Sequence, residues 1–225
     1  MAEATGGNAS PGGVRIGVLA LQGDFAAHAA ALERAGAQAC EIRRADELAA
    51  LDGLVIPGGE STTLILLLRA FNLWEPVRAF AAGGRPVFGT CAGLILLADE
   101  VTNPAQEAFG LLPLRVERNA YGRQVDSFVA RGQVQVPADL TGGEGRTFET
   151  DLVFIRAPRI TEVRDGVQVW ARHAGEPILV RRANLLGASF HPELSSDNRV
   201  VRLFVTMTER ARATRQEGAA TGEGG

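Results

Sequence analysis

The chain has 225 residues, a formal net charge of −3 and two cysteines. Its length fits a single domain, and 46% hydrophobic with 22% charged residues allow a core of ordinary size. The slightly acidic balance argues against a general basic surface for nucleic acid or anionic membranes. Two cysteines are too few for a disulfide framework, so we expect a reducing, cytoplasmic setting. Residues 1–13 are small and polar and the longest apolar run is short, so we expect neither a signal peptide nor a membrane span.

Low-complexity sequence flanks one continuous pattern of strand and helix signals. Residues 1–13 and 213–225 are rich in glycine, alanine and small polar side chains, which predicts two disordered tails. The intervening residues 14–212 carry the alternating apolar pattern and are predicted to form one domain.

In the first half of the chain, short apolar runs alternate with segments of helical spacing. Strands are predicted at residues 14–21, 38–42, 54–56 and 86–88, and helices at 25–35, 61–70, 74–82 and 94–98. Ser61 is the expected N-cap of the second helix. This alternation is typical of an α/β fold, with a mostly parallel sheet covered by helices on both faces.

The second half of the chain has many strand signals and few helix signals. Further strands are predicted at residues 124–130, 133–136, 153–155, 167–173, 178–180 and 185–190, with a terminal helix at 198–212. Few helices separate these strands, so part of the sheet is expected to be antiparallel. The glycine-rich segment 141–146 is predicted to be a surface loop.

Cys91 is the strongest candidate for chemistry. It lies in Gly-Thr-Cys-Ala-Gly (89–93), between an apolar strand and an apolar helix, which is the setting of a nucleophile elbow. The start of the helix favours the reactive thiolate, and the N–H of Ala92 is free to bind an oxyanion. A buried structural cysteine is the alternative for any single cysteine, and Cys40, which has no such turn, keeps that interpretation.

A cysteine nucleophile needs a base, and the chain has three histidines, of which His191 has the most informative context. His191 and Glu193 flank Pro192 after an apolar strand, and residues two apart in extended backbone point to one side. The carboxylate could then orient the imidazole. His28, on the first helix, is predicted to be structural or near an interface. The absence of metal-ligand spacing predicts no metal site.

Two further segments could build a pocket around this centre. The loop Pro-Gly-Gly-Glu-Ser-Thr (57–62) follows a strand, and a backbone N–H there could be a second oxyanion donor. It lacks a Walker lysine, so phosphate binding is not supported. Arg118 and Arg156 lie next to strand ends, where a guanidinium could bind an amino-acid carboxylate, although spacing alone does not separate them from solvated surface arginines.

Six segments in order resemble a known family. They are LALQG (19–23), PGGESTT (57–63), GTCAGLI (89–95), RNAYGRQVDSF (118–128), FIRAP (154–158) and SFHPE (189–193). The set resembles the class I (triad) glutamine amidotransferases and, within them, the glutaminase subunits of pyridoxal 5′-phosphate synthase. The resemblance covers residues 14–209 and implies a three-layer fold with a central, mostly parallel sheet.

The resemblance also implies roles for individual residues. Cys91 would be the nucleophile, His191 the base and acid, and Glu193 the group that orients His191. The implied L-glutamine contacts are Gly59, Glu60, Ser61, Arg118, Ile155 and Arg156, and the implied oxyanion hole comprises Gly58, Gly59 and Ala92.

The implied reaction is hydrolysis of L-glutamine to L-glutamate and ammonia through a thioester, with no cofactor. Ammonia would pass to a (β/α)8-barrel synthase subunit that makes pyridoxal 5′-phosphate. Three alternatives share some of these residues: a glutaminase serving another synthase, a cysteine-elbow hydrolase of the same architecture, and a relative without catalytic activity.

Overall fold

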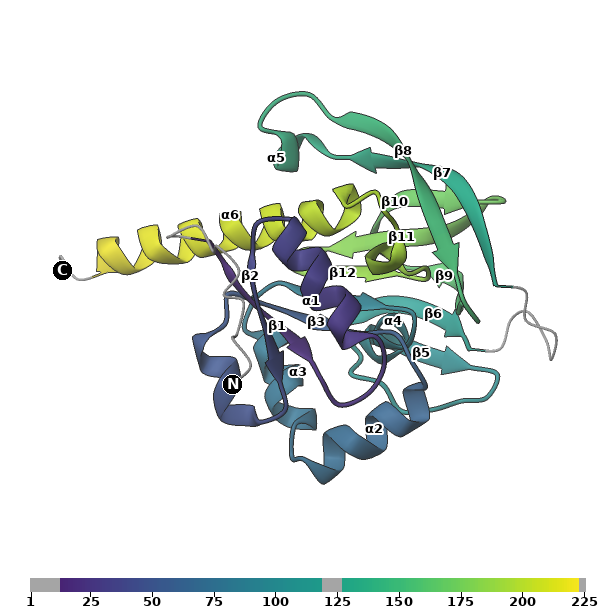
Figure 1. The fold of residues 1–225 in the computed structure, drawn as a ribbon, viewed down its shortest axis with the longest axis horizontal. Helices are drawn as coiled ribbons and strands as arrows, with labels where there is room; N and C mark the ends of the chain where they lie inside the picture. Colours follow the sequence, from purple (N-terminus) through teal and green to yellow (C-terminus); the bar gives the residue numbers. More distant parts are fainter. Residues whose placement is uncertain (1–12, 119–126, 223–225) are drawn as a thin grey trace, which may run out of the picture.

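The computed structural model describes residues 13–118 and 127–222. Residues 1–12 of the predicted N-terminal tail, residues 119–126 of the RNAYGRQVDSF segment and residues 223–225 lie outside the described residues. Figure 1 gives the arrangement of the helices and strands in the described part.

The elements follow one another as alternating strands and helices up to α4 and mainly as strands after it. The helices are α1 (Phe25–Arg34), η1 (Ala45–Ala50), α2 (Ser61–Ala70), α3 (Trp74–Ala82), α4 (Ala92–Leu97), α5 (Ala138–Thr141), η2 (Pro192–Leu194) and α6 (Arg199–Gly222), where η denotes a 3-10 helix. The strands are β1 (Arg15–Leu19), β2 (Gln38–Ile42), β3 (Gly53–Ile56), β4 (Val87–Thr90), β5 (Ala98–Thr102), β6 (Leu112–Glu117), β7 (Phe128–Val136), β8 (Arg146–Phe154), β9 (Arg159–Val163), β10 (Gln168–His173), β11 (Glu176–Arg182) and β12 (Leu185–Ala188).

Within the described residues, nine strands form one sheet in the order β2-β1-β3-β4-β12-β11-β10-β7-β8. The strands from β2 to β12 in this order run parallel, and the remaining pairings are antiparallel. A second sheet of the described chain has three strands, in the order β5-β6-β9. The α/β prediction with an antiparallel part in the second half is therefore confirmed.

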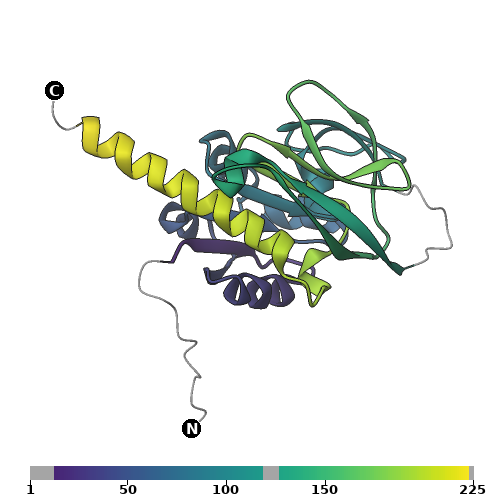
Figure 2. The same ribbon diagram turned by 90° about the horizontal axis from the view of Figure 1, so that it is seen from above.

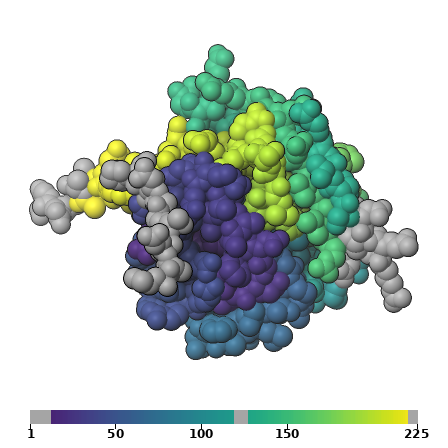
Figure 3. Space-filling view, viewed as in Figure 1, coloured from purple at the N-terminus to yellow at the C-terminus, as the bar shows by residue number. Residues whose placement is uncertain are grey.

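Helices cover both faces of the large sheet. On one face α1 and α6 contact each other and pack on the sheet, and the space-filling view shows them side by side (Figure 3). On the other face α2, α3 and α4 share a second apolar core with the small sheet. Figures 1 and 2 together show the sheet between these two layers. In the described part of the chain, no helix is long and apolar enough to cross a membrane.

The strands that follow α4 differ from the prediction. The described residues of the strands predicted at 124–130 and 133–136 belong to one strand, β7, which pairs without interruption with β8. Gly132, between the two predicted strands, lies inside the ladder opposite Thr150, and a Cβ there would lie 2.5 Å from the side chain of Leu152. None of the three strands of the small sheet, β5, β6 and β9, was predicted, and β5 begins directly after α4 without an intervening loop.

The C-terminal helix is longer than predicted. Helix α6 continues to Gly222, through residues that were predicted to be a disordered tail. Arginine, alanine, glutamine and glutamate in this stretch are good helix formers, and they extend a helix already anchored by packing. Polar contacts hold the extension: the guanidinium of Arg212 donates to the carbonyl of Gly13 (3.1 Å), and Arg215 lies 3.2 Å from Asp52.

Candidate active site

The predicted functional residues gather at the carboxyl ends of neighbouring parallel strands. Strand β3 leads into the loop of residues 57–60, β4 leads into Cys91, and β12 leads towards His191. These three strands are adjacent in the sheet, with β4 in the centre. Ligand sites of open α/β sheets lie in crevices at this edge, and sheet topology alone brings the three segments together.

Cys91 has the strained backbone of a nucleophile elbow, with φ 48° and ψ −103°. The turn requires glycine on both sides of Cys91, because the surroundings of Gly89 and Gly93 leave no room for a side chain. A Cβ on Gly89 would lie 2.5 Å from the carbonyl of Gly93, and a Cβ on Gly93 would lie 2.0 Å from the carbonyl oxygen of Ile56. The two glycines therefore let the elbow fold onto itself and onto β3.

The elbow is anchored to the neighbouring strand and leaves one donor unused. The N–H of Cys91 donates to the carbonyl of Ala188 on β12 (2.8 Å). Cys91 is 5% exposed, and its sulfur lies 3.9 Å from the carbonyl of Ile155. The N–H of Ala92 makes no hydrogen bond to any described residue, so it remains available to an oxyanion beside the thiol.

His191 and Glu193 form a buried pair. The Nδ1 of His191 lies 2.7 Å from Oε1 of Glu193, and the two residues are 5% and 4% exposed. The prediction that they lie side by side holds, but the backbone differs, because Pro192 to Leu194 form the 3-10 helix η2 and not an extended segment. The N–H of His191 donates to the carbonyl of Val153 on β8 (2.8 Å), which fixes the histidine to the antiparallel part of the sheet.

The surroundings of this pair favour its ionised form. Burial acts to lower the pKa of His191, but the side chains of Cys91 and Glu193 outweigh burial and raise the pKa to about 10. Burial acts to raise the pKa of Glu193, and the neighbouring His28 and His191 outweigh it, so the pKa lies below its usual range. A carboxylate next to an imidazole that holds its proton is the arrangement that supports a thiolate.

The glycine loop lies against both reactive side chains. A Cβ on Gly58 would lie 2.5 Å from Cε1 of His191 and 3.2 Å from Cβ of Cys91. Gly59 has φ 146°, and a Cβ there would lie 2.4 Å from the side-chain amide of Gln22. Only glycine fits at these positions, and the backbone of the loop is thereby brought next to the thiol.

Glu60 has the capping role that was predicted for Ser61. Its carboxylate accepts hydrogen bonds from the N–H groups of Thr62 (3.3 Å) and Thr63 (2.7 Å) at the start of α2. Ser61 instead donates from its hydroxyl to Gln106 (2.9 Å). The capping prediction was wrong because the longer glutamate side chain, one residue earlier, reaches the free N–H groups first.

Arg118 reaches the same loop from the end of β6. Its Nη2 lies 3.0 Å from Oε1 of Glu60 and 3.0 Å from the hydroxyl of Thr62. The side chain of Arg118 is 12% exposed, so this pair is partly withdrawn from solvent and carries both signs of charge at the mouth of the site. Ile155 and Arg156, the latter with φ 44°, also line the site.

These segments enclose a cavity of about 210 Å³. Its lining combines the thiol, the imidazole, the glycine loop and the arginines. The lining residues are Gly23, Asp24, Gly58, Gly59, Glu60, Ser61, Cys91, Ile95, Arg118, Ile155, Arg156 and His191. Of the predicted site residues, Glu193 and Ala92 are not in the lining: Glu193 lies behind His191, and Ala92 is fully buried after Cys91.

Gly23, Asp24 and Ile95 in the lining were not predicted to belong to the site, and neither were three residues around it. Gln22 accepts the N–H of Glu60 through its side-chain oxygen (3.0 Å). His28 lies beside Glu193, and Thr90 lies beside His28. The spacing of His28 from Ala31 and Leu32 places it on the buried face of α1, and this pattern could have indicated a buried histidine without indicating its partners.

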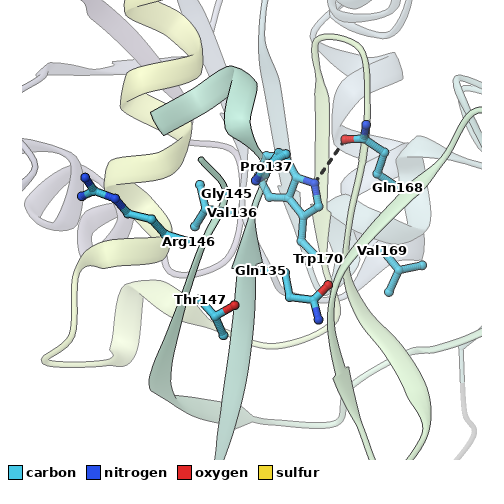
Figure 4. A pocket seen from close by; sticks show the side chains of 9 residues that line it. All are labelled: Gln135, Val136, Pro137, Gly145, Arg146, Thr147, Gln168, Val169 and Trp170. Carbon is cyan, nitrogen blue, oxygen red and sulfur yellow. Dashed lines mark hydrogen bonds between the residues drawn. The ribbon is translucent and has the colours of Figure 1, made fainter. Parts of the chain in front are cut away.

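A larger cavity of about 390 Å³ lies between the β7–β8 hairpin and β10 (Figure 4). Trp170 and Gln168 line it, and the indole N–H donates to the glutamine side chain. No cysteine, histidine or carboxylate is in its described lining, so it lacks the groups that the smaller cavity offers for acyl transfer. In the described ranges, no cluster of three or more His, Cys, Asp or Glu side chains could hold a metal ion.

The fold and the cysteine elbow at its sheet edge are those of a glutamine amidotransferase. The chain belongs to the SNO glutamine amidotransferase family, whose sequence profile matches residues 18–210. Comparison with known proteins narrows this class further. A pyridoxal 5′-phosphate synthase subunit PdxT of Solibacter usitatus is 54% identical over 194 residues, which is 85% of this chain and 98% of that protein.

Further relatives agree. The corresponding subunit PdxT of a Parafrankia species is 55% identical, over 85% of this chain and 91% of its own length. A crystal structure of a glutamine amidotransferase superposes with a TM-score of 0.76 at 44% identity, covering 86% of this chain and 98% of that one. The family resemblance found in the sequence motifs is thus confirmed.

Proposed function

We propose that this chain is the glutaminase subunit of a pyridoxal 5′-phosphate synthase and hydrolyses L-glutamine to L-glutamate and ammonia. The observation that supports the chemistry best is that His191, held from behind by the buried Glu193, lines the same cavity as the strained Cys91. The PdxT relatives carry the name of the synthase, and they direct the proposal to vitamin B6 synthesis.

In the proposed first half-reaction, the thiolate of Cys91 attacks the side-chain amide carbon of glutamine. The amide oxygen takes the negative charge and is bound by the N–H of Ala92 together with an N–H of Gly58 or Gly59. The proton held by His191 passes to the amide nitrogen, and the C–N bond breaks to release ammonia and leave a thioester. Glu193 keeps the imidazole in the orientation that both transfers need.

The second half-reaction returns the enzyme to its starting state. His191, now neutral, accepts a proton from water, and the resulting hydroxide attacks the thioester carbon. A second oxyanion forms in the same place, the C–S bond breaks, and glutamate leaves while Cys91 returns as thiolate beside the protonated imidazole. Both halves use one set of donors because the carbonyl oxygen occupies the same position throughout.

The mouth of the cavity supports recognition of the amino-acid end of glutamine. Glu60 and Arg118 form an ion pair there, and the same two charges complement the α-ammonium and α-carboxylate of a free amino acid. Gly59, Ser61, Ile155 and Arg156 line the remaining walls and are proposed to contact the rest of the substrate.

The partner is proposed to be a (β/α)8-barrel synthase subunit that consumes the ammonia. Ammonia released into neutral water is mostly protonated and is then no longer a nucleophile. A glutaminase that serves biosynthesis therefore gains from direct transfer to the enzyme that uses its product. The (β/α)8-barrel architecture of that enzyme is what the family resemblance of the sequence motifs implies.

The test is glutamate release from L-glutamine with and without the barrel subunit, with the Cys91→Ala protein as the blank. Stimulation by the barrel subunit supports both the chemistry and the pathway. A rate of glutamate release that is the same with and without the barrel subunit indicates a different synthase partner. No turnover in either condition, or undiminished turnover by a folded Cys91→Ala protein, rejects the proposed mechanism.

A further inference from the structure

The proposed reaction leaves one buried ionisable side chain next to the catalytic pair without a role. His28, on α1, is 2% exposed, which is unusual for a side chain that can carry charge. Its Nε2 lies 3.0 Å from the hydroxyl oxygen of Thr90 and 3.2 Å from Oε1 of Glu193. The imidazole therefore contacts the residue before the nucleophile and the carboxylate behind the base.

Glu193 depends on few partners. Its Oε1 is within reach of two imidazole nitrogens, Nδ1 of His191 at 2.7 Å and Nε2 of His28 at 3.2 Å. Its Oε2 is buried and has no hydrogen-bond partner among the described residues. A buried carboxylate with two nitrogen partners is sensitive to the loss of either one, because burial alone would favour the neutral acid.

The charge of Glu193 determines which nitrogen of His28 carries the proton. A carboxylate is an acceptor, so a stable contact at 3.2 Å requires a proton on Nε2 of His28. One N–H then lies within reach of two oxygens, from Glu193 and Thr90, as in a three-centre hydrogen bond. Among the described residues, Glu193 on η2 is the charged group facing His28, and Thr90 on β4 faces it with a neutral hydroxyl.

We propose that His28 is a positioning residue, which holds the carboxylate of Glu193 ionised and in place so that Glu193 can orient His191. In this arrangement α1 contributes to the catalytic centre although none of its side chains reaches the substrate. The kinetic part of this inference rests on the proposed glutaminase function. The electrostatic part does not, because it concerns the reactivity of Cys91 in the absence of substrate.

Two substitutions at position 28 distinguish the effect of side-chain length from the effect of side-chain polarity. His28→Gln places an amide N–H near the position of Nε2, whereas the shorter side chain of His28→Asn is polar but does not extend to Glu193. Leu32→Ala is the matched control, because Leu32 is equally buried one turn along α1, within the apolar core. All three proteins are compared with the wild type at a temperature where circular dichroism shows them folded.

The first measurement is the rate of alkylation of Cys91 by iodoacetamide across pH 5 to 9, resolved by peptide mass spectrometry from alkylation of Cys40. Without a second partner Glu193 is more easily neutralised, so His191 supports the thiolate less well. We expect the midpoint for His28→Asn to move up by about one pH unit, with His28→Gln close to the wild type. Superimposable profiles for His28→Asn and Leu32→Ala would overturn the inference.

The second measurement is glutamine hydrolysis by the complex with the barrel subunit. We expect kcat of His28→Asn to fall about tenfold or more with KM within twofold, and His28→Gln to restore most of the loss. An alkylation shift in a protein whose wild type lacks glutaminase activity would uphold the role of His28 and reject the proposed function. Normal wild-type turnover with no effect of His28→Asn on kcat or on alkylation would uphold the proposed function and reject the role of His28.

Discussion

Gly58→Ala adds one methyl group between the nucleophile and its base. The new Cβ would lie 2.5 Å from Cε1 of His191 and 3.2 Å from Cβ of Cys91, whereas ordinary contacts begin at 3.4 Å. The imidazole must therefore move by roughly 1 Å, because the thiol is fixed by the elbow. A misplacement of this size costs about 100-fold in rate, or about 2.7 kcal/mol of transition-state stabilisation.

The assay is kcat for glutamate release, measured together with thermal unfolding. Overpacking of this kind costs about 1–3 kcal/mol of stability, so the variant should remain folded at the assay temperature. Alanine keeps the backbone N–H, so the loss is steric and does not come from a missing oxyanion donor. Gly143→Ala is the matched control, because a Cβ there meets nothing within 4 Å. A Gly58→Ala protein with wild-type kcat would refute the proposed packing of the loop against His191.

Three further predictions concern binding, pH and folding. Arg118→Ala should raise KM for glutamine about tenfold or more with a smaller effect on kcat, and an unchanged KM in steady-state kinetics would contradict its role. The raised pKa of His191 contributes stability that is complete below its usual value of 6.5 and is lost as pH rises towards about 10, so the wild-type Tm should fall across this window. His191→Asn should lack that component of the fall. Gly93→Ala should destabilise by about 3 kcal/mol or more in chemical denaturation, because its Cβ would lie 2.0 Å from the backbone oxygen of Ile56.

The sequence predicted the first half of the fold well because local signals and tertiary structure agree there. Helices α2 and α3 and strand β2 have the predicted bounds, and the ends of β1, β3 and β4 differ from the prediction by at most two residues. In this region β1, β3 and β4 are almost entirely buried, and α1, α2 and α3 each have one buried face, so periodicity carries most of the information.

The second half was harder because its elements depend on partners. Strand β7 carries exposed side chains along most of its length, and it is a strand because β8 supplies the hydrogen bonds. The extension of α6 depends on Asp52, which is distant in sequence and pairs with Arg215. Neither dependence leaves a local pattern in the chain.

The site was predictable where chemistry requires a residue type at a fixed turn. Cys91 and the glycines around it could be identified from spacing, since a sharp strand-to-helix turn needs residues without a Cβ at defined positions. The contact of His28 with Glu193 joins residues 165 positions apart, and the sequence around either residue contains no pattern that predicts the contact. Long-range polar contacts of this kind appear only when the packing of α1 on the sheet is known.

The uninterrupted pairing of β7 with β8 also offers a place for protein engineering. The register runs from Phe128 opposite Phe154 to Val136 opposite Arg146 without a bulge. Val153, which holds the backbone of His191, is therefore separated from the hairpin tip by seven strand residues, or roughly 23 Å of extended chain. A fluorophore or an affinity handle introduced at Gly143 would sit on a rigid arm, remote from the thiol, and could report on assembly while turnover proceeds.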